Sequence, residues 1–270
     1  MESTGREAKP SLPGHGDGDD KEFMATLAKG LAVLGAFGRQ RPSMTLSEAA
    51  EVADLSRAAA RRVLRTLSML GYVEQQGRHF SLSPRILEFG FAYLSTQSWI
   101  DRALPLMREL SERLGESCSA AILQGRDIVY VGRVPARRIM SAALSVGSRL
   151  PALHTALGRV LFGYLDEAEI WRRLKAQRIE AYTPQSITDL QALFDRIRAD
   201  REQRFSIVDE ELERGLRSIA VPIKDRLGQA IAGLNVSTHS TRTTRNEMRE
   251  RFLPALKAIA AQLSQSVARA

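Results

Sequence analysis

The chain contains a single cysteine, Cys118, among its 270 residues. One thiol excludes an intramolecular disulfide and a zinc site built from several cysteines, and it favours a reducing compartment. No apolar run approaches the roughly 20 residues that a helix needs to cross a bilayer. The N-terminus carries Gly, Pro and Asp where a signal peptide would have a basic patch and an apolar core. These absences predict a cytoplasmic protein with no membrane partner.

Motifs that mark common catalytic sites are also missing. The sequence has no Gly-x-Ser-x-Gly elbow, no phosphate-binding glycine loop and no His-Glu-x-x-His zinc pair. Its four histidines, at positions 15, 79, 154 and 239, lack the spacing of metal ligands. We therefore expect a protein that is not an enzyme and that holds neither a metal nor a cofactor. Cys118 is interpreted as a small buried apolar residue and His154 as a structural histidine.

The composition is that of a globular protein, with 44% hydrophobic and 26% charged residues. A chain of this length predicts about two domains. Lysine and arginine exceed aspartate and glutamate by 39 to 31, which gives a net charge of +8. Such an excess suits a polyanionic partner only where the basic residues cluster. Residues 1–22 form the first segment, which is rich in Gly, Pro and Asp and is expected to be a disordered tail.

A winged helix-turn-helix is predicted over residues 23–84. Apolar residues at helical spacing predict a first helix that ends at Gly38: Phe23, Leu27, Leu31, Leu34 and Phe37. Thr45 and Glu48 form a capping box for a second helix, and Ser56 caps a third that ends at Gly71. The period then drops to two in residues 72–76 and 79–82, which predicts a hairpin of the wing type.

The third helix of this domain carries the strongest chemical signal. Apolar residues occupy one arc (Ala59, Ala60, Val63, Leu64, Leu67, Leu70), and Arg57, Ala58, Arg61, Arg62, Arg65 and Ser68 occupy the other. The segment has no acid, so its arginines favour an external anion. A merely solvated basic face is the alternative, but the capped helix before it and the wing after it favour docking to DNA.

Double-stranded DNA is therefore the predicted partner of this domain. Ser56, Arg57, Arg61 and Arg62 are placed near base edges, while Arg39, Arg41 and Arg65 are better placed for phosphates. The wing side chains Gln75, Gln76, Arg78 and His79 could reach phosphate or the minor groove, although a simple exposed turn is about as common for any one of them. The predicted DNA-binding residues are Arg39, Arg41, Thr45, Ser56, Arg57, Arg61, Arg62, Arg65, Gln76 and Arg78.

Residues 85–98 are predicted to form a linker helix, because the stretch is too apolar for a solvated linker and should pack against a partner. Residues 99–270 mix helical and strand patterns, which predicts an α+β domain with an antiparallel sheet and flanking helices. The expected strands are 119–123, 127–133, 139–145, 205–209, 218–223 and 230–237. The expected helices are 103–114, 155–165, 166–176, 189–203 and a closing helix from Arg245.

Three stretches in order resemble the IclR family of bacterial regulators over about residues 23–268. They are MTLSEAAEVADLSRAAARRVLRTLSMLGYV, VGSRLPALHTALGRVLFGYL and FSIVDEELERGLRSIAVPIKDRLGQAIAGLNVS. KEFMATLAKGLAVLGAF and RVPARRIMSAALSVGSRLPA resemble the PcaR, PcaU and PobR branch, which controls aromatic-acid catabolism through the β-ketoadipate pathway. The resemblance implies a winged helix, a dimerising linker helix and a GAF-like effector domain. It also implies a homodimer that often pairs into a tetramer on DNA.

The resemblance further implies a pocket for a small organic acid effector, aromatic or keto. Carried onto this chain, the pocket residues are Ala142, Ala156, Leu157, Leu216, Ser218, Asn235 and Ser237. Many family members have Gly-Lys where this chain has Gly158-Arg159, and a cysteine where Ser218 stands. From chemistry alone, each polar residue of the set could equally be a satisfied group in a sheet.

Several groups could hold the acid's carboxylate. The start of the helix after Thr155 offers free amides, and one of Arg137 and Arg138 could point inward. Asp209 either orients a neighbour or ends a strand.

Three other functions stay open on sequence: an IclR-type repressor of another carboxylic-acid pathway, a small-molecule enzyme, and a winged helix used for protein contacts. Binding to DNA should weaken steeply with ionic strength, which separates the last from a DNA-binding regulator.

Overall fold

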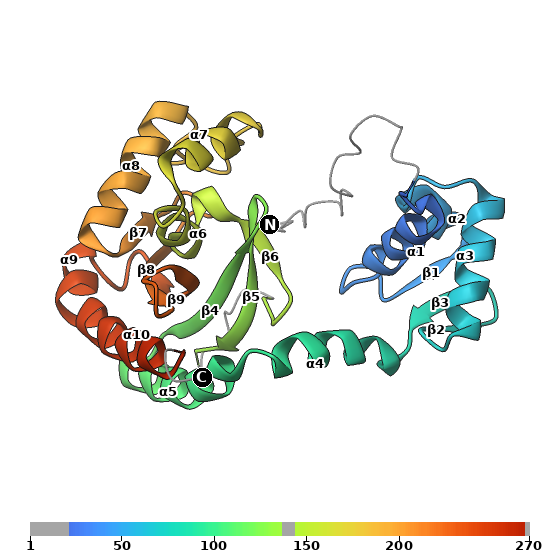
Figure 1. Ribbon diagram of the computed structural model, residues 1–270, viewed down its shortest axis with the longest axis horizontal. Coiled ribbons are helices and arrows are strands. Elements are labelled where there is room, and N and C mark those ends of the chain that lie inside the picture. Colours follow the sequence, from blue (N-terminus) through green and yellow to red (C-terminus); the bar gives the residue numbers. More distant parts are fainter. Residues whose placement is uncertain (1–21, 137–143, 268–270) are drawn as a thin grey trace. The chain divides into compact units, whose positions relative to one another are not determined.

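The computed structural model describes residues 22–136 and 144–267 (Figure 1). The chain divides into two compact units, an N-terminal unit of residues 1–93 and a C-terminal unit of residues 94–270. Within the two described stretches, no helix combines the length and the apolar character that crossing a membrane requires.

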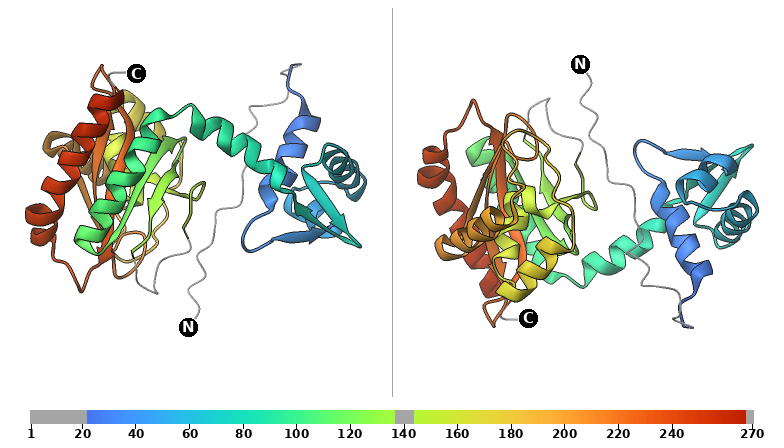
Figure 2. Two further views of the ribbon diagram at one scale, coloured as in Figure 1. Left: turned by 90° about the horizontal axis from the view of Figure 1, so that it is seen from below. Right: turned by 90° about the horizontal axis from the view of Figure 1, so that it is seen from above.

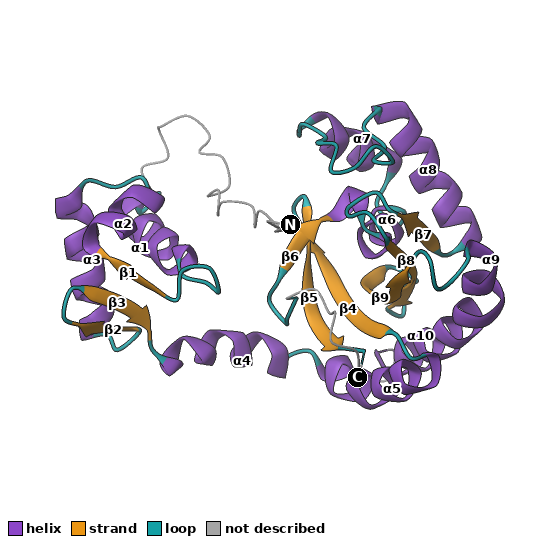
Figure 3. Cartoon of the chain, turned by 180° about the vertical axis from the view of Figure 1, so that it is seen from behind, coloured by secondary structure: helices purple, strands orange, loops and turns teal. Residues whose placement is uncertain are grey.

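The N-terminal unit packs helices on a small antiparallel sheet (Figure 3). Its helices are α1 (Ala25–Ala36), α2 (Leu46–Val52), α3 (Arg57–Met69) and, after a 3-10 turn at Pro84–Ile86, α4 (Leu87–Ser95), which runs past the unit's end. Its strands β1 (Ser43–Thr45), β2 (Val73–Gln76) and β3 (His79–Leu82) lie in the order β1-β3-β2. This arrangement of helices and hairpin confirms the winged helix-turn-helix.

The predicted caps begin both central helices. Thr45 Oγ1 accepts from the Glu48 amide at 3.3 Å, and the Glu48 carboxylate accepts from the Thr45 amide at 2.7 Å. Ser56 Oγ accepts from the Ala59 amide at 3.2 Å and starts α3. Each cap satisfies an amide that has no partner within the helix. A common core holds the helices and the sheet together, with Val33, Ala36, Phe37, Met44, Ala49, Leu64, Leu67 and Val73 buried.

Only the C-terminal end of the apolar stripe predicted for the first helix is buried, because Phe37 lies in the core and Leu34 packs against it. Phe23, Leu27 and Leu31 are 50%, 58% and 56% exposed, and the core instead takes Val33 and Ala36. The helix begins at Ala25, two residues later than predicted. Because its sequence, ATLAKGLAVLGA, is apolar on more than one side, periodicity alone does not choose the buried face. The result is an exposed apolar strip, the α1 strip, formed by Leu27 and Leu31 of α1 and by Phe23 and Met24 just before it.

The C-terminal unit is built on a six-stranded antiparallel sheet in the order β6-β5-β4-β9-β8-β7. The strands are β4 (Ser117–Gln124), β5 (Asp127–Val134), β6 (Arg149–Pro151), β7 (Ser206–Asp209), β8 (Leu216–Lys224) and β9 (Ala230–His239). The helices are α5 (Ser98–Leu114), α6 (Ala156–Phe162), α7 (Glu167–Lys175), α8 (Leu190–Gln203), α9 (Arg245–Glu247) and α10 (Leu253–Val267). A 3-10 turn (Ala152–His154) precedes α6, and a π-helical turn (Met248–Phe252) joins α9 to α10.

Each face of the sheet is covered by its own helices. Helices α5 and α10 lie side by side on one face (Figure 2), where the core includes Cys118, Leu234 and Val236. Helices α6, α7 and α8 build the core of the other face. Burial raises the pKa of the Cys118 thiol, so the residue is the inert apolar group expected. The α+β class with flanked antiparallel sheet is confirmed.

Several predicted boundaries are wrong. Helix α5 begins at Ser98 rather than 103 and contains Pro105, while α6 is only seven residues long. The short strands β1 and β6 were not predicted, because three residues carry too little pattern. Of the strand predicted at 139–145, residues 139–143 lie outside the described residues, and Leu144 and Ser145 are not in a strand.

Candidate nucleic-acid interface and ligand site

Four arginines project from the exposed face of α3. Buried Ala60, Leu64 and Leu67 fix the opposite face of the helix on the core of the N-terminal unit. The exposed residues are Arg57, Arg61, Arg62 and Arg65, and none has an acidic partner within residues 22–136 and 144–267. Like charges spaced by four residues on a helix repel one another mildly. The face is therefore most favourable when an external polyanion lies against it.

The remaining predicted DNA-binding residues lie around this helix. Arg39 and Arg41 are exposed on the turn after α1, while Gln76 and Arg78 are exposed beside the tight turn at Gly77. Ser56 keeps its hydroxyl proton free for another acceptor, since it accepts in its cap. The Thr45 hydroxyl already accepts from the Glu48 amide and donates to the Glu48 carboxylate at 2.8 Å. A contact with DNA through Thr45 would have to compete with that cap.

Two residues of α3 differ from their predicted arcs. Leu70, placed on the apolar arc, is 52% exposed at the end of the helix. Ser68, placed on the basic arc, is half-buried, and its Oγ is buried without a hydrogen-bond partner in the part of the chain that is described. Both departures occur in the last turn, where the chain leaves the helix for Gly71.

A row of polar side chains crosses the α6-covered face of the large sheet. We call it the polar row, and its members are Arg133 (β5), Ser119 (β4), Asn235 and Ser237 (β9) and Ser218 (β8). The register pairs Arg133 with Ser119, Ser119 with Asn235, and Ser218 with Ser237. Side chains of directly paired residues lie on one face of a sheet, so the strands bring the five together.

The hydrogen bonds within the polar row leave one buried side-chain oxygen without a partner among the described residues. Arg133 Nη1 donates to Ser119 Oγ at 3.3 Å, and Asn235 Nδ2 donates to Ser237 Oγ at 3.0 Å. Asn235 is only 4% exposed, and its Oδ1 has no hydrogen-bond partner among the described residues. A buried carbonyl oxygen without a donor is costly, which makes this position suited to a ligand that donates a hydrogen bond.

The predicted effector residues fall around the polar row. Ser218, Asn235 and Ser237 belong to it, and Leu216 lies two residues before Ser218 along β8. Ala156 and Leu157 are buried at the start of α6, where Leu157 packs against Gly233. Ala142, together with Arg137 and Arg138, lies outside the described residues.

Sequence reasoning missed two members of the row, Ser119 and Arg133. Both lie in strands that were predicted, but only the pairing of β4 with β5 and β9 places them beside Asn235. The β4–β5 pairing also contains a register shift at Ala120/Ala121. Beyond this bulge, strict alternation of side chains counted from the β4–β5 turn no longer predicts which face of the sheet a residue occupies.

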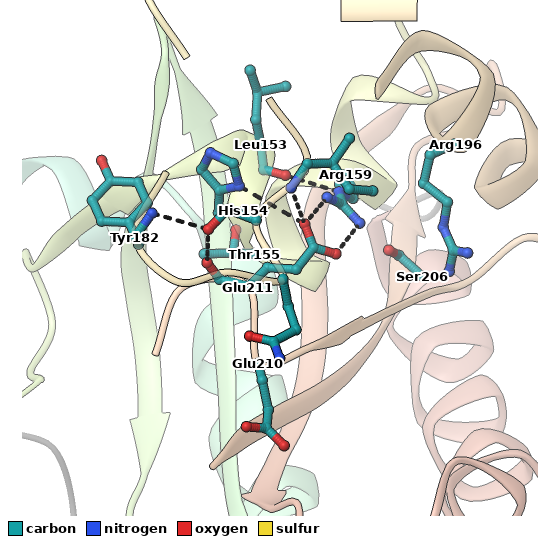
Figure 4. Close-up of polar contacts among 12 residues, drawn as sticks. Leu153, His154, Thr155, Arg159, Tyr182, Arg196, Ser206, Glu210 and Glu211 are labelled. Carbon is teal, nitrogen blue, oxygen red and sulfur yellow. Dashed lines mark hydrogen bonds and ion pairs between the residues drawn. The ribbon is translucent and has the colours of Figure 1, made fainter. Parts of the chain in front are cut away.

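The start of α6 is fixed by a close backbone approach and by the buried ion pair of Arg159 with Glu211, which Figure 4 shows. A Cβ on Gly158 would lie 2.1 Å from the Ala152 carbonyl oxygen, so only glycine fits there. Arg159 is fully buried: its Nε donates to the Leu153 carbonyl at 2.8 Å and its Nη1 to Glu211 Oε1 at 2.7 Å. Its Nη2 bonds the second oxygen of the same carboxylate. The pair ties the turn before α6 to the loop before β8.

The carboxylate of Glu211 is the centre of this network. His154, 3% exposed, places its Nδ1 3.8 Å from Glu211 Oε2 and its ring edge-on to Tyr182. Burial alone would raise the pKa of Glu211, but His154 and Arg159 outweigh it and hold the pKa below its usual value. The hydroxyls of Thr183 and Ser186 donate to the Glu210 and Glu211 carbonyls, both at 2.6 Å. His154 thus lies buried beside the Arg159–Glu211 pair, and its structural role stays a prediction.

The structure bears on two further predictions, for the start of the helix after Thr155 and for Asp209. The helix after Thr155 has seven residues, and Thr155 Oγ1 already accepts from the Gly158 amide at 3.0 Å. A short capped helix offers a weak dipole and few free amides, so its N-terminus is a poor carboxylate site. Asp209 is paired with Arg217 at 2.7 Å, so it orients a neighbour within the fold.

Comparison with known proteins matches both units of the chain. Residues 26–77 match the IclR helix-turn-helix domain, and residues 91–265 match the bacterial transcriptional regulator IclR C-terminal domain. The chain belongs to the IclR family. The matched helix-turn-helix domain includes α3, and the two matches confirm the family resemblance drawn from the sequence.

Within the IclR family, the chain resembles regulators named for the Pca regulon and PobR. It is 43% identical over 245 residues to the Pca regulon regulatory protein of Pseudomonas putida, covering 90% of this chain and 84% of that protein. A transcriptional regulator from Rhodococcus sp. RHA1 has a TM-score of 0.80 at 40% identity, over 91% of this chain and 98% of that one. The PobR inducer-binding domain from Acinetobacter, a double mutant in complex with 3-hydroxybenzoic acid, has a TM-score of 0.58 at 27% identity, over 61% of this chain and 97% of that one. These similarities support the PcaR and PobR branch.

Proposed function

We propose that this IclR-family regulator controls aromatic-acid catabolic genes, and that it binds operator DNA through α3 and a hydroxylated or keto carboxylic acid at the polar row. The observation that carries the effector part is the buried, unpartnered Asn235 Oδ1 between polar neighbours on the α6-covered face. The similarity to a Pca regulon regulator and to a domain crystallised with 3-hydroxybenzoic acid favours an aromatic acid. The part played by the chain is regulatory and not catalytic, and we place it in the cytoplasm.

The proposed DNA contacts follow the exposure of the basic side chains. Arg57, Arg61 and Arg62, with Ser56, lie in the N-terminal half of α3, the half that enters the major groove in helix-turn-helix proteins. Arg65, Arg39 and Arg41 are assigned to phosphates. The wing contributes Gln76 and Arg78. Arginine paired with guanine would supply the base preference, and the phosphate contacts would supply a large part of the affinity.

A homodimer is the proposed DNA-binding form. The apolar side chains of α4 are left on the surface, with Leu87, Phe89 and Phe91 exposed by 69%, 59% and 73%. The α1 strip adds a second exposed apolar surface on the same unit. Contiguous apolar surface of this kind marks protein interfaces. Two copies related by a twofold axis would present two α3 helices to half-sites about one helical turn, or a multiple, apart.

Helix α4 is the proposed route from effector to DNA. Its beginning is anchored in the N-terminal unit, where the Phe89 ring stacks on Tyr72 with 5.3 Å between centroids and Arg85 Nη1 donates to the Leu70 carbonyl at 2.8 Å. Near its end, Leu94 packs against the core of the α5–α10 face in the C-terminal unit. An acid that alters the packing around the sheet would thus change the separation of the two α3 helices in a dimer.

A thermal-shift screen of the purified protein tests the effector class. Protocatechuate, 4-hydroxybenzoate and β-ketoadipate are compared with acetate and with neutral phenol. We expect a raised melting temperature with at least one aromatic or keto acid, because a ligand that binds only the folded state stabilises it. Stabilisation by an unrelated carboxylic acid alone would instead assign the protein to another catabolic pathway.

A further inference from the structure

One arginine of the C-terminal unit lacks the acidic partner that comparable arginines have. Five arginines in the described part of that unit are buried or half-buried: Arg133, Arg159, Arg173, Arg196 and Arg217. The last four each pair with a carboxylate. Arg159 binds Glu211 at 2.7 Å, and Arg173 binds Glu169 at 2.6 Å. Arg196 lies 3.1 Å from Asp200, and Arg217 lies 2.7 Å from Asp209. Arg133 has no acid within 4.0 Å among the described residues.

Among the described residues, the neighbourhood of Arg133 offers no countercharge. Its one side-chain bond goes from Nη1 to the neutral hydroxyl of Ser119 at 3.3 Å. Residues 137–143, which lie outside the described part of the chain, contain no aspartate or glutamate. Burial lowers the pKa of the guanidinium, and Tyr130 offsets a part of that shift. A half-buried cation without a partner costs stability, so it is retained more readily where a ligand brings the missing anion.

Arg133 and Asn235 are the two residues that pair with Ser119, one on each side of it across the sheet. The register places Arg133 on β5, Ser119 on β4 and Asn235 on β9 in one line across the sheet. Two strand spacings amount to about 10 Å between backbones, and the Arg133 side chain reaches inward toward Ser119. A benzene ring that carries a carboxylate at one end and a hydroxyl at the other can bridge the Arg133 guanidinium and the Asn235 side-chain oxygen.

We propose that Arg133 binds the carboxylate of the effector and that Asn235 Oδ1 accepts a hydrogen bond from a ring hydroxyl at its other end. This inference rests on the proposed function and narrows it to hydroxylated aromatic monocarboxylates. The guanidinium fork matches two carboxylate oxygens, and the bond to the anion is charge-assisted. Benzoate satisfies only Arg133, and phenol satisfies only Asn235.

Calorimetric titration of the purified chain with three ligands tests this division of roles. The ligands are 4-hydroxybenzoate, benzoate and phenol, and the proteins are wild type, Arg133→Met, Arg133→Lys and Asn235→Ala. The matched control is Arg126→Met, which removes an exposed arginine from the β4–β5 turn. We expect Arg133→Met to weaken both acids by about 10- to 100-fold and to leave phenol unchanged. Arg133→Lys should lose less affinity for the two acids, because lysine keeps the positive charge but lacks the paired N–H donors of the guanidinium.

Asn235→Ala should weaken 4-hydroxybenzoate and phenol and leave benzoate nearly unchanged. Thermal melting of the ligand-free variants gives an independent readout, because removal of an unpaired cation should not lower the melting temperature, whereas removal of a structural arginine should. Wild-type affinity of Arg133→Met for 4-hydroxybenzoate would overturn the inference and leave the proposed function standing. If wild type binds none of the acids in the thermal-shift screen, the proposed function fails and the inference fails with it. If only a non-aromatic acid binds, the aromatic class is wrong, and titration of Arg133→Met with that acid decides whether Arg133 holds its carboxylate.

Discussion

The arginines of α3 and the buried arginine of the C-terminal unit show opposite electrostatic designs. Arg57, Arg61, Arg62 and Arg65 are exposed and have no acidic partner among the described residues, so they are held ready for an anion from outside. Arg159 is fully buried, and Glu211 binds its guanidinium through two oxygens. Pairing with an acid thus separates arginines that build the fold from arginines available to a partner. Arg133 lies inside the fold and still belongs to the second group.

The largest effect, a loss of folding stability, is expected when the acidic partner of buried Arg159 is removed. Glu211→Ala should lower the free energy of unfolding by about 3–5 kcal/mol, because it leaves the Arg159 cation buried and uncompensated. Replacing both residues, as Arg159→Met with Glu211→Leu, should restore most of the loss. Urea denaturation of the wild type and the two variants measures this. A double variant as unstable as the single one would show that the ion pair itself supplies the stability.

Acid should act on the same pair. The pKa of Glu211 is lowered in the folded state, so the unfolded chain binds more protons as the pH falls. The resulting stability is fully present above the ordinary glutamate pKa and is lost as the pH falls through the lowered one. We expect wild type, but not the double variant, to lose this part of its stability below about pH 4. Equal acid sensitivity of the two in denaturant titrations would argue against the assignment.

An intermediate effect is expected from the unpaired arginines of α3. Arg61→Ala should relax base preference by about 1–3 kcal/mol at one operator position, because arginine reads guanine with two hydrogen bonds. The fold should be unaffected, since Arg61 is exposed and bonds no other described side chain. Binding titrations against operators with single base changes measure the preference. Unchanged discrimination at every position would move Arg61 from the bases to the phosphates.

The wing is expected to contribute to DNA affinity independently of base sequence. Arg78→Ala is expected to weaken binding to the operator and to scrambled DNA alike, and to reduce the slope of log affinity against log salt by about 1. The exposed position of Arg78 beside Gly77 suits a backbone contact. If Arg61→Ala and Arg78→Ala changed base preference in the same way, the division between helix and wing would be wrong.

The smallest effect is expected from an arginine that is paired but exposed. Glu169 binds Arg172 and Arg173 on the surface of α7, and these bonds lower its pKa to about 2. Arg172→Ala should raise that pKa, as NMR titration of the carboxyl carbon would show, and leave the melting temperature unchanged. Exposed ion pairs contribute little to stability because solvent screens them. A clear drop in melting temperature would weaken the distinction between buried and exposed pairs.

The sequence predicted the N-terminal unit better than the ligand site, for physical reasons. Thr45, Glu48 and Ser56 form caps with residues three positions away, so local pattern is sufficient to place α2 and α3. Arg133 and Asn235 are about a hundred positions apart, and only the β5–β4–β9 register brings them near one another. The Arg159–Glu211 pair likewise spans 52 residues. The outward face of α1 was misjudged because both of its sides are apolar.

The direct test of the account is a fluorescence-anisotropy titration of the protein's own promoter region across a range of salt concentrations, with and without the acid that stabilises the protein. We predict saturable binding whose affinity falls steeply with salt, as expected when several unpaired arginines meet phosphates, and a shift in that affinity when the acid is present. An affinity for DNA that changes with neither salt nor the acid would contradict the claim that the unpaired arginines of this chain bind DNA and the effector acid.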